Sequence, residues 1–362
     1  MGTTTPNSAF IRVINRRQVL ALAFGAMVGW SWVALTGVWI AGAGAAGAML
    51  AFGIGGSIVM LVGLTYAELA AAMPLVGGEH VYSHRALGRT ASFVCTWAIL
   101  LGYASVVAFE AVALPTVLEY LVPGFSRGYL WTIAGWDVNV TWVLTGALAA
   151  IAMIVINILG IRTAARLQVL VVIVVLLSGL GLMSGAIVAG DVGNGGPLFS
   201  GGLAGMLSVL VMVPFMFVGF DVIPQSAEEI DLPFAAIGRL LVISILLAIA
   251  WYVLVIGAVA MGLPEAERAL SALPTADAAA ALFNGSWAGK LLVIGGVAGI
   301  LTSWNAFLIG GSRALYALAK AGQVPSAFAA LHPRYRTPHH AILLVGGLAV
   351  FAPLFGRPAM VW

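Results

Sequence analysis

The residues best suited to chemistry lie in the stretch 203–233, LAGMLSVLVMVPFMFVGFDVIPQSAEEIDLP. An apolar segment of membrane-spanning length is interrupted here by Pro214, Gly219 and Pro224. A carboxylate, Asp221, stands beside the interruption. Backbone that leaves the helix at membrane depth is tolerated only where it lines a cavity or is buried in protein. A carboxylate in a spanning helix is costly and by default marks a functional position. This stretch is therefore predicted to form a binding site, whereas most other apolar segments are predicted to be helices that pack around it.

A second interruption is expected in the first apolar run. Residues 25–32, GAMVGWSW, place two glycines and a serine among bulky side chains near the middle of that run. A broken helix presents free N–H groups at one half-helix N-terminus, which suit a carboxylate. Its free carbonyls at the other end suit an ammonium group or a metal cation. Two broken helices in corresponding positions of two halves are typical of a transporter built from inverted repeats, with its site between them.

Composition determines the class of protein. Of the 362 residues, 62% are hydrophobic and 8% are charged, against roughly 45–50% and about 25% in soluble domains. The apolar runs are about 20 residues long, which predicts an all-α polytopic membrane protein and not a β-barrel. The single cysteine, Cys95, excludes a disulfide within the chain and a cysteine-rich metal site. No nucleophile–base pair or metal-ligand cluster stands out, so neither an enzyme nor a metal centre is expected.

Nine apolar runs are expected to cross the membrane. They are residues 18–40, 44–70, 90–118, 141–160, 167–189, 203–225, 239–262, 288–312 and 340–356. The 45 glycines are concentrated in these spans and at their ends, where most are expected to allow close helix packing.

The basic residues set the expected orientation. With a cytoplasmic N-terminus, most of the 16 Lys and Arg residues flank the inner ends of the spans, as the positive-inside rule requires. The inner residues are Arg12, Arg16, Arg17, Arg85, Arg89, Arg162, Arg166, Arg239, Arg313, Lys320, Arg334 and Arg336, and the outer ones are Arg127, Arg268, Lys290 and Arg357. Residues 1–17 are polar and lack the cleavage site of a secretory signal, so they are expected to be a cytoplasmic tail. We therefore expect a multi-pass protein of the cell (plasma or inner) membrane.

Three ordered stretches carry a family resemblance that covers nearly the whole chain. They are YAELAAAMPLVGGEHVYSHRALG at 66–88, FVGFDVIPQSAEEIDLP at 217–233 and SRALYALAKAGQVPSAFAALHPRYRTPHHAI at 312–342. Together they resemble the signatures of the amino acid/polyamine/organocation (APC) superfamily of permeases. The resemblance implies a LeuT-type fold, in which five helices are repeated inverted and the substrate binds at broken spans one and six. It also implies alternating access by rocking of a helix bundle.

The resemblance divides the chain into a first repeat, residues 18–190 with spans one to five, and a second repeat, residues 191–362 with spans six to nine. The second repeat is incomplete, because a tenth span is needed to match the fifth and relatives usually have about twelve. The chain is expected to be truncated. A partner that supplies the missing helix is the alternative.

The resemblance also assigns residues to the substrate site. They are Gly25, Val28, Gly29, Trp30, Ser31, Phe215, Gly219 and Asp221. The amides of Gly29, Trp30 and Ser31 would hold a substrate carboxylate, and Phe215 matches an aromatic lid in relatives. Relatives usually read Gly-x-Gly and then a small apolar pair, whereas this chain has indoles at 30 and 32. These indoles leave less room, which favours small substrates; packing or lipid contact is their alternative role.

A sodium site is also implied. Thr302 and Ser303, in LTSWN at 301–305, resemble the hydroxyl pair of a sodium site in LeuT-type transporters. By the same alignment the carbonyls of Gly25, Val28 and Gly299 would complete five oxygen ligands, which suit a hard cation. Hydroxyl groups in membrane helices also bond their own backbone or a neighbouring helix, and this alternative stays open.

Other ionisable residues are expected to be secondary. Glu110 follows Arg89 by about 30 Å along a helix at 1.5 Å per residue, so it is expected to snorkel or pair near the outer interface. Lining the transport pathway is its alternative role. Glu228 and Glu229 are expected to take part in gating or to pair with Arg239 or another inner arginine.

Many proton-coupled relatives carry a lysine in the fifth span, where this chain is expected to place Val174 or Val175. No cofactor is expected, and the coupling ion, Na⁺ or H⁺, is left open. We expect secondary active transport of an amino acid or related small amine, with the lipid bilayer and a small-molecule substrate as partners and no nucleic acid. Two alternatives remain. One is a transporter of ethanolamine or a polyamine, with Asp221 pairing the ammonium, and the other is a non-transporting membrane subunit or receptor. The oligomeric state is left open.

Overall fold

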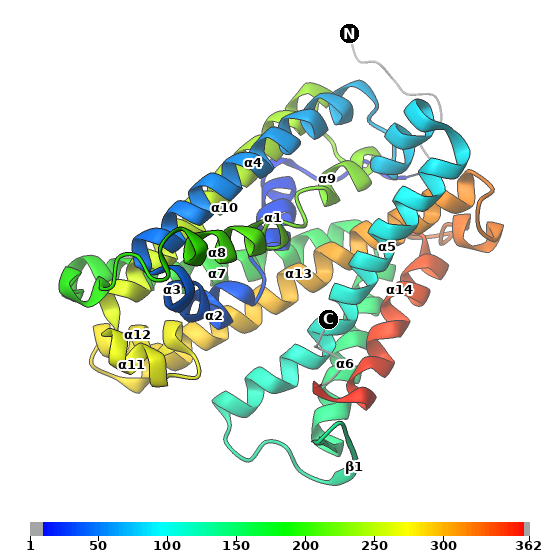
Figure 1. Cartoon of the computed structure of the whole chain (residues 1–362). Helices are drawn as coiled ribbons and strands as arrows, with labels where there is room; N and C mark the ends of the chain where they lie inside the picture. The colour runs from blue at the N-terminus through cyan, green and yellow to red at the C-terminus, as the bar shows by residue number, and fades with distance from the viewer. Residues whose placement is uncertain (1–9, 358–362) are drawn as a thin grey trace.

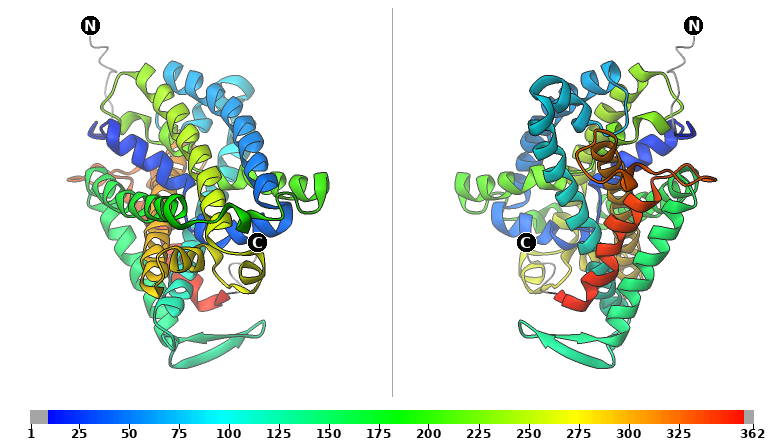
Figure 2. Two further views of the ribbon diagram at one scale, coloured as in Figure 1. Left: turned by 90° about the vertical axis from the view of Figure 1, so that its left-hand side faces the viewer. Right: turned by 90° about the vertical axis from the view of Figure 1, so that its right-hand side faces the viewer.

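The computed structural model describes residues 10–357, which are almost entirely α-helical (Figure 1). The helices are α1 (Arg16–Met27), α2 (Ser31–Ala34), α3 (Thr36–Ala43), α4 (Ala45–Ala72), α5 (Glu79–Leu121), α6 (Val140–Ile158), α7 (Ile161–Ala189), α8 (Gly202–Met216), α9 (Val222–Gln225), α10 (Phe234–Gly262), α11 (Glu265–Leu270), α12 (Pro274–Leu282), α13 (Ser286–Lys320) and α14 (His339–Phe351). Short 3₁₀ turns are η1 (Val192–Gly195), η2 (Ala227–Glu229), η3 (Ser326–Ala329) and η4 (Ala352–Phe355). One antiparallel hairpin, β1 (Tyr129–Ile133) with β2 (Trp136–Asn139), projects from the end of the molecule (Figure 2). Residues 1–9 of the predicted tail and the last five residues lie outside the described part.

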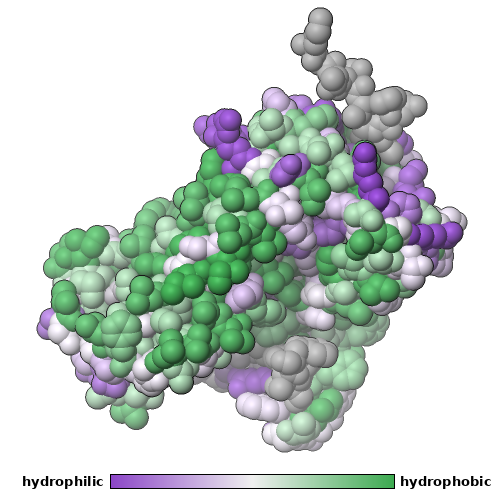
Figure 3. All heavy atoms as spheres, turned by 45° about the horizontal axis from the view of Figure 1, so that its top comes forward, coloured by the Kyte–Doolittle hydropathy of each residue, from purple (hydrophilic) through white to green (hydrophobic). Residues whose placement is uncertain are grey.

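Six helices are long and apolar enough to cross a membrane, namely α4, α5, α6, α7, α10 and α13. The first and sixth predicted spans are interrupted helices, α1–α3 and α8–α9, and the ninth is the shorter α14 continued by η4. Figure 3 shows hydrophobic residues over most of the visible face, with many of the strongly hydrophilic ones towards the end that carries the N-terminal residues. The prediction of an all-α polytopic membrane protein is confirmed.

The long helices pack in two groups. In one, α10 lies along α4, and α8 packs on α4 (Figure 1). In the other, α5, α6, α13 and α14 pack on one another. Helices α1 and α7 contact both groups, through α10 and α13. Helix α9 also contacts α10 and α13, so the breaks of both interrupted helices lie where one group meets the other. The division into repeats at 18–190 and 191–362 stays a prediction.

Glycines bring α4 and α10 close together. A Cβ atom added at Gly56 would lie 2.5 Å from Ile249, and one added at Gly63 would lie 2.3 Å from Ile245. Neither distance is tolerable between carbon atoms, so these positions need a hydrogen as the side chain. Small residues at such contacts let two backbones approach closely, which is how membrane helices gain dispersion energy from each other.

Candidate functional site

The first interruption separates α1 from α2. Helix α1 ends at Met27, the backbone of Val28 leaves the helical region (φ −103°, ψ 68°), and helix resumes at Ser31. In the described part of the chain, the N–H groups of Gly29, Trp30 and Ser31 donate to no backbone carbonyl. The predicted break is confirmed. These free N–H groups are the donors that the resemblance assigns to a carboxylate; that role stays a prediction.

The second interruption separates α8 from α9 and depends on Gly219. Its φ of 122° lies in a region that side chains rarely allow. Asp221 holds the break from inside. Its Oδ1 accepts the N–H of Gly219 at 3.0 Å, and its Oδ2 accepts the hydroxyl of Tyr103 from α5. Both oxygens of this carboxylate are therefore hydrogen-bonded within the protein.

A tyrosine of α10 joins the two interruptions. The hydroxyl of buried Tyr252 donates to the carbonyl of Met27, at the end of α1, over 2.7 Å. It also lies 3.3 Å from the carbonyl of Met216, at the end of α8, and 3.0 Å from the hydroxyl of Ser31. Carbonyls released by a helix end need donors when buried, and the single hydrogen of this phenol goes mainly to the nearer carbonyl, that of Met27, with the Met216 carbonyl also within reach. Sequence reasoning missed this residue, for which the only signal was a lone phenol in the otherwise apolar span 239–262.

Tyr252→Phe is expected to lower the free energy of unfolding by about 1–3 kcal/mol, because buried carbonyls lose their donor. The rate of transport should fall with it, since both interruptions lose a shared anchor. Thermal unfolding of the purified protein and uptake into vesicles measure the two effects. Tyr129→Phe, on the exposed hairpin, is the matched control. Equal stability and transport in the two variants would remove the anchoring role.

Aromatic residues fill the space around the sixth-span interruption. The side chain of Phe217 is fully buried and packs against Phe52 and Tyr252, with ring centroids 6.5 and 5.6 Å away. Phe215, the predicted lid, is 68% exposed and lies outside this cluster. The structure thus places Phe217, and not Phe215, among the buried aromatic residues here, and the lid role of Phe215 is untested.

The two indoles of the first interruption take part in packing. Trp32 is fully buried and meets Trp251 edge to face at 5.3 Å. The ring of Trp30 covers Gly296, where an added Cβ atom would lie 2.2 Å from it. Both indoles therefore pack against other helices, which is the alternative role expected for them.

Four of the five groups of the predicted sodium site lie together. The Thr302 hydroxyl is 2.8 Å from the carbonyl of Gly25 and 2.7 Å from that of Gly299. The Ser303 hydroxyl is 3.1 Å from the same Gly299 carbonyl. The fifth residue, Val28, lies in the adjoining interruption. The two hydroxyl groups are bonded to backbone carbonyls, as the alternative to a sodium site predicts. The five groups are nevertheless all oxygen ligands, which suit a hard cation.

Two residues of α7 pack against Gly25, a predicted site residue of α1. The residues that face Gly25 are Gln168 and Val172, which would lie 2.6 and 2.8 Å from a Cβ atom added there. The amide nitrogen of Gln168 donates to the carbonyls of Ala21 and Thr302, each at 3.2 Å. That Val174 or Val175 stands where many proton-coupled relatives carry a lysine stays a prediction.

Glu110 is buried beside the first interruption, so the expectation that its side chain snorkels at the outer interface was wrong. Its side chain is only 3% exposed, and its Oε1 accepts the hydroxyl of Ser303. A Cβ atom added at Gly29 would lie 3.8 Å from the same oxygen. Beyond the kink at Gly88, α5 continues to Leu121, roughly 50 Å at 1.5 Å per residue. Such a helix exceeds a hydrocarbon core of about 30 Å, so counting from Arg89 does not give depth.

The acidic end of the sixth span forms a buried ion pair. Glu229 accepts Arg313 through two bonds of 2.9 Å, and both side chains are at most 1% exposed. Glu228 accepts the N–H of Val76 at 3.1 Å. The expected pairing with an inner arginine is confirmed, and the arginine is the one on α13.

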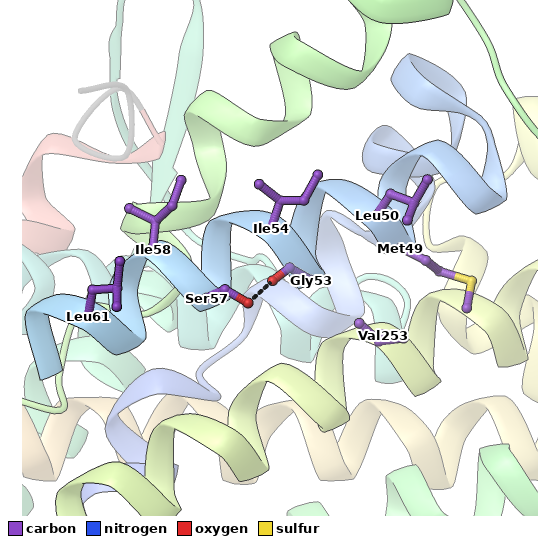
Figure 4. Close-up of a pocket in the computed structure, with 8 residues that line it drawn as sticks. All are labelled: Met49, Leu50, Gly53, Ile54, Ser57, Ile58, Leu61 and Val253. Atoms are coloured by element: carbon purple, nitrogen blue, oxygen red, sulfur yellow. Dashed lines mark hydrogen bonds between the residues drawn. The ribbon is translucent and has the colours of Figure 1, made fainter. Parts of the chain in front are cut away.

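A groove on the outside of α4 is not part of this site (Figure 4). Its lining comprises Met49, Leu50, Gly53, Ile54, Ser57, Ile58, Leu61 and Val253. The hydroxyl of Ser57 is already bonded to the carbonyl of Gly53 at 2.7 Å. A groove lined by apolar side chains, whose one hydroxyl is already bonded, lacks the polar groups that would orient an amino acid. Within residues 10–357, no three His, Cys, Asp or Glu side chains gather to hold a metal ion.

The sequence is similar to those of known membrane transporters. Residues 14–357 match the family model described as amino acid permease. A branched-chain amino acid permease of Bacillus subtilis is 25% identical over 354 residues, covering 96% of this chain and 76% of the relative. Human cationic amino acid transporter 4 is 27% identical over 365 residues, 97% of this chain and 56% of the relative. A methylthioribose transporter of Bacillus subtilis is 23% identical over 376 residues, 96% and 76%.

Proposed function

Because this chain belongs to the amino acid permease family, we propose that it is a secondary active transporter of an amino acid or a related small amine. It moves the substrate across the cytoplasmic membrane by alternating access, with the N-terminus on the cytoplasmic side. One observation carries the proposal. Two helices that are interrupted at Val28–Trp30 and at Phe217–Asp221 have their broken ends joined by one hydroxyl group, that of Tyr252.

The two helix groups supply the moving parts. Helices α1, α4, α8, α9 and α10 carry the interruptions and their anchor, whereas α5, α6, α13 and α14 pack on one another beside them. Rocking of the first group on the second would open the interruptions to one side of the membrane at a time. The free N–H groups of Gly29, Trp30 and Ser31 would hold a carboxylate of the substrate.

Sodium is the proposed coupling ion, with H⁺ as the alternative. The hydroxyl groups of Thr302 and Ser303 and the carbonyls of Gly25, Val28 and Gly299 would hold it. The support is the all-oxygen donor set and the contacts among four of its members. Such a cation would link α1 to α13, that is, one helix group to the other.

Counter-flow into proteoliposomes tests the function. Vesicles loaded with an unlabelled compound are given the same compound labelled, for a panel of branched-chain amino acids, cationic amino acids, ethanolamine and a polyamine. We expect exchange of at least one α-amino acid, absent from protein-free vesicles. Exchange of none of the panel, by protein shown to be folded, would contradict transport of this class. Uptake that is unchanged when choline replaces sodium at fixed pH would exclude sodium coupling.

A non-amino-acid amine, such as ethanolamine or a polyamine, is the second candidate. Its ammonium could pair with the buried carboxylate of Glu110, as that of an amino acid could, because one oxygen of Glu110 has no hydrogen-bond partner in the described part of the chain. Exchange of an amine without a carboxylate, and of no amino acid, would select this candidate.

A further inference from the structure

We propose that Glu110, and not Asp221, is the carboxylate that receives the ammonium group of the transported molecule. The inference rests on the proposed function and makes it narrower: the substrate carries a primary ammonium, and that group is recognised by a side chain of α5. Sequence reasoning gave this role to Asp221, in the interrupted sixth span, and only for the alternative of a non-amino-acid amine.

The hydrogen bonds of the two acids differ. Asp221 accepts a backbone N–H from Gly219 on one oxygen and the Tyr103 hydroxyl on the other. Glu110 accepts the Ser303 hydroxyl on Oε1, while its Oε2 is buried with no partner in the described part of the chain. An ammonium group has three N–H donors and needs acceptors that are free. Of these two acids, Glu110 has an oxygen that accepts no bond, whereas each oxygen of Asp221 already accepts one.

The position of Glu110 suits one end of a zwitterion. Its Oε1 lies 3.8 Å from the place of a Cβ atom on Gly29, so the carboxylate adjoins the first interruption. The N–H groups of Gly29, Trp30 and Ser31 have no backbone acceptor there. A molecule with its ammonium at Glu110 and its carboxylate at these N–H groups satisfies both sets of free groups. The two charges of an α-amino acid are carried on neighbouring carbon atoms and match this short separation.

When it is ionised, Glu110 is not balanced by a cation of the protein. Among residues 10–357, no arginine, lysine or histidine forms an ion pair with it within 4.0 Å. An isolated carboxylate in a nonpolar interior is costly unless a cation or donors compensate it. Glu79 is another buried acid with a free oxygen, and its other oxygen accepts the amide of Gln225. It lies at the first turn of α5, whereas Glu110, which adjoins Gly29, lies near the other end of the same helix.

Glu110→Gln tests the charge while sparing the contact, since the Gln carbonyl can still accept the Ser303 hydroxyl. Binding is measured for a transported α-amino acid and for the α-hydroxy acid of the same carbon skeleton. The wild type should prefer the amino acid by about 10- to 100-fold, as expected of a charge-assisted bond. Glu110→Gln should bind both acids equally. Glu68→Gln, at an exposed position of α4, should keep the wild-type preference.

A second measurement uses the wild type and does not depend on the folding of a variant. The carboxyl reagent dicyclohexylcarbodiimide is applied, and modification of Glu110 is followed by peptide mass spectrometry. Saturating amino acid should slow the modification of Glu110 at least tenfold, and the hydroxy acid should not.

The outcomes separate this inference from the proposed function. If Glu110→Gln keeps the preference for the amino acid, or if both compounds protect Glu110 equally, the assignment is overturned while transport stands. If Glu110→Gln keeps the preference for the amino acid but loses sodium-dependent binding, the assignment is also overturned. In that case Glu110 binds an inorganic cation and not the ammonium group. Absence of exchange in the wild type for every amine and amino acid tested overturns the proposed function itself.

Discussion

Arg313→Leu is expected to lower the free energy of unfolding by about 3–5 kcal/mol, because it leaves the charge of Glu229 buried and unpaired. The two side chains are 0% and 1% exposed, and among residues 10–357 the Ser312 hydroxyl is the one other group bonded to the guanidinium. Thermal or denaturant unfolding of the purified protein in detergent measures the loss. A loss below about 1 kcal/mol, the scale of a surface pair, would contradict this account.

Two further variants isolate the cause. Arg313→Leu combined with Glu229→Leu removes both charges and should recover much of the lost stability, since an apolar pair of similar volume often replaces a buried ion pair without loss. Arg162→Leu, at an exposed position on α7, removes an arginine without orphaning a buried partner and should change stability little.

The Arg313 variant should also disturb transport, because the segment that holds Glu229 anchors the start of the first span. The carbonyl of Glu229 accepts the N–H groups of Val13 and Ile14 at 2.9 and 3.0 Å. Arg12 reaches the carbonyl of Ile230 at 2.9 Å. These contacts tie the residues just before α1 to the loop that follows α9, so loosening one interrupted helix loosens the entry to the other.

Gly219→Ala is expected to reduce the transport rate to below about a tenth and to destabilise the protein by about 1–3 kcal/mol through backbone conformation alone. The φ of 122° at this residue disfavours any side chain, and an added Cβ atom would lie 2.5 Å from that of Ala26 and 3.0 Å from the Ala26 carbonyl carbon. The clash is between α1 and the sixth-span interruption, so relief requires the two interruptions to separate.

Gly102→Ala is the matched control for this prediction. Gly102 lies inside α5, and a Cβ atom added there meets nothing within 4 Å. Uptake and thermal unfolding should match the wild type, with a slight gain in stability because alanine favours a helix more than glycine does. Wild-type transport by Gly219→Ala would show that the left-handed backbone at the sixth-span interruption is not required.

Local sequence determined the class of protein and the position of both helix interruptions. Apolar runs of membrane length with few charges dictate spanning helices, because unpaired backbone is too costly in lipid. Pro214 and Gly219 predict where the sixth span stops being a helix, since proline lacks an N–H group and glycine alone accepts a φ of 122° easily. These effects act within a few residues, so one sequence suffices to detect them.

Tertiary structure alone decided which side chains meet at those interruptions. Tyr252 lies 225 positions from Met27, and Ser303 lies 193 from Glu110. Such contacts depend on the register and tilt of packed helices, and apolar helices that face lipid on one side show little periodicity to reveal that register. For this reason the sequence pointed to Asp221, because the proline and glycine residues near it in the chain mark an interrupted helix. It gave Glu110 a secondary role. The structure shows that Glu110 has an oxygen without a hydrogen-bond partner beside the first interruption.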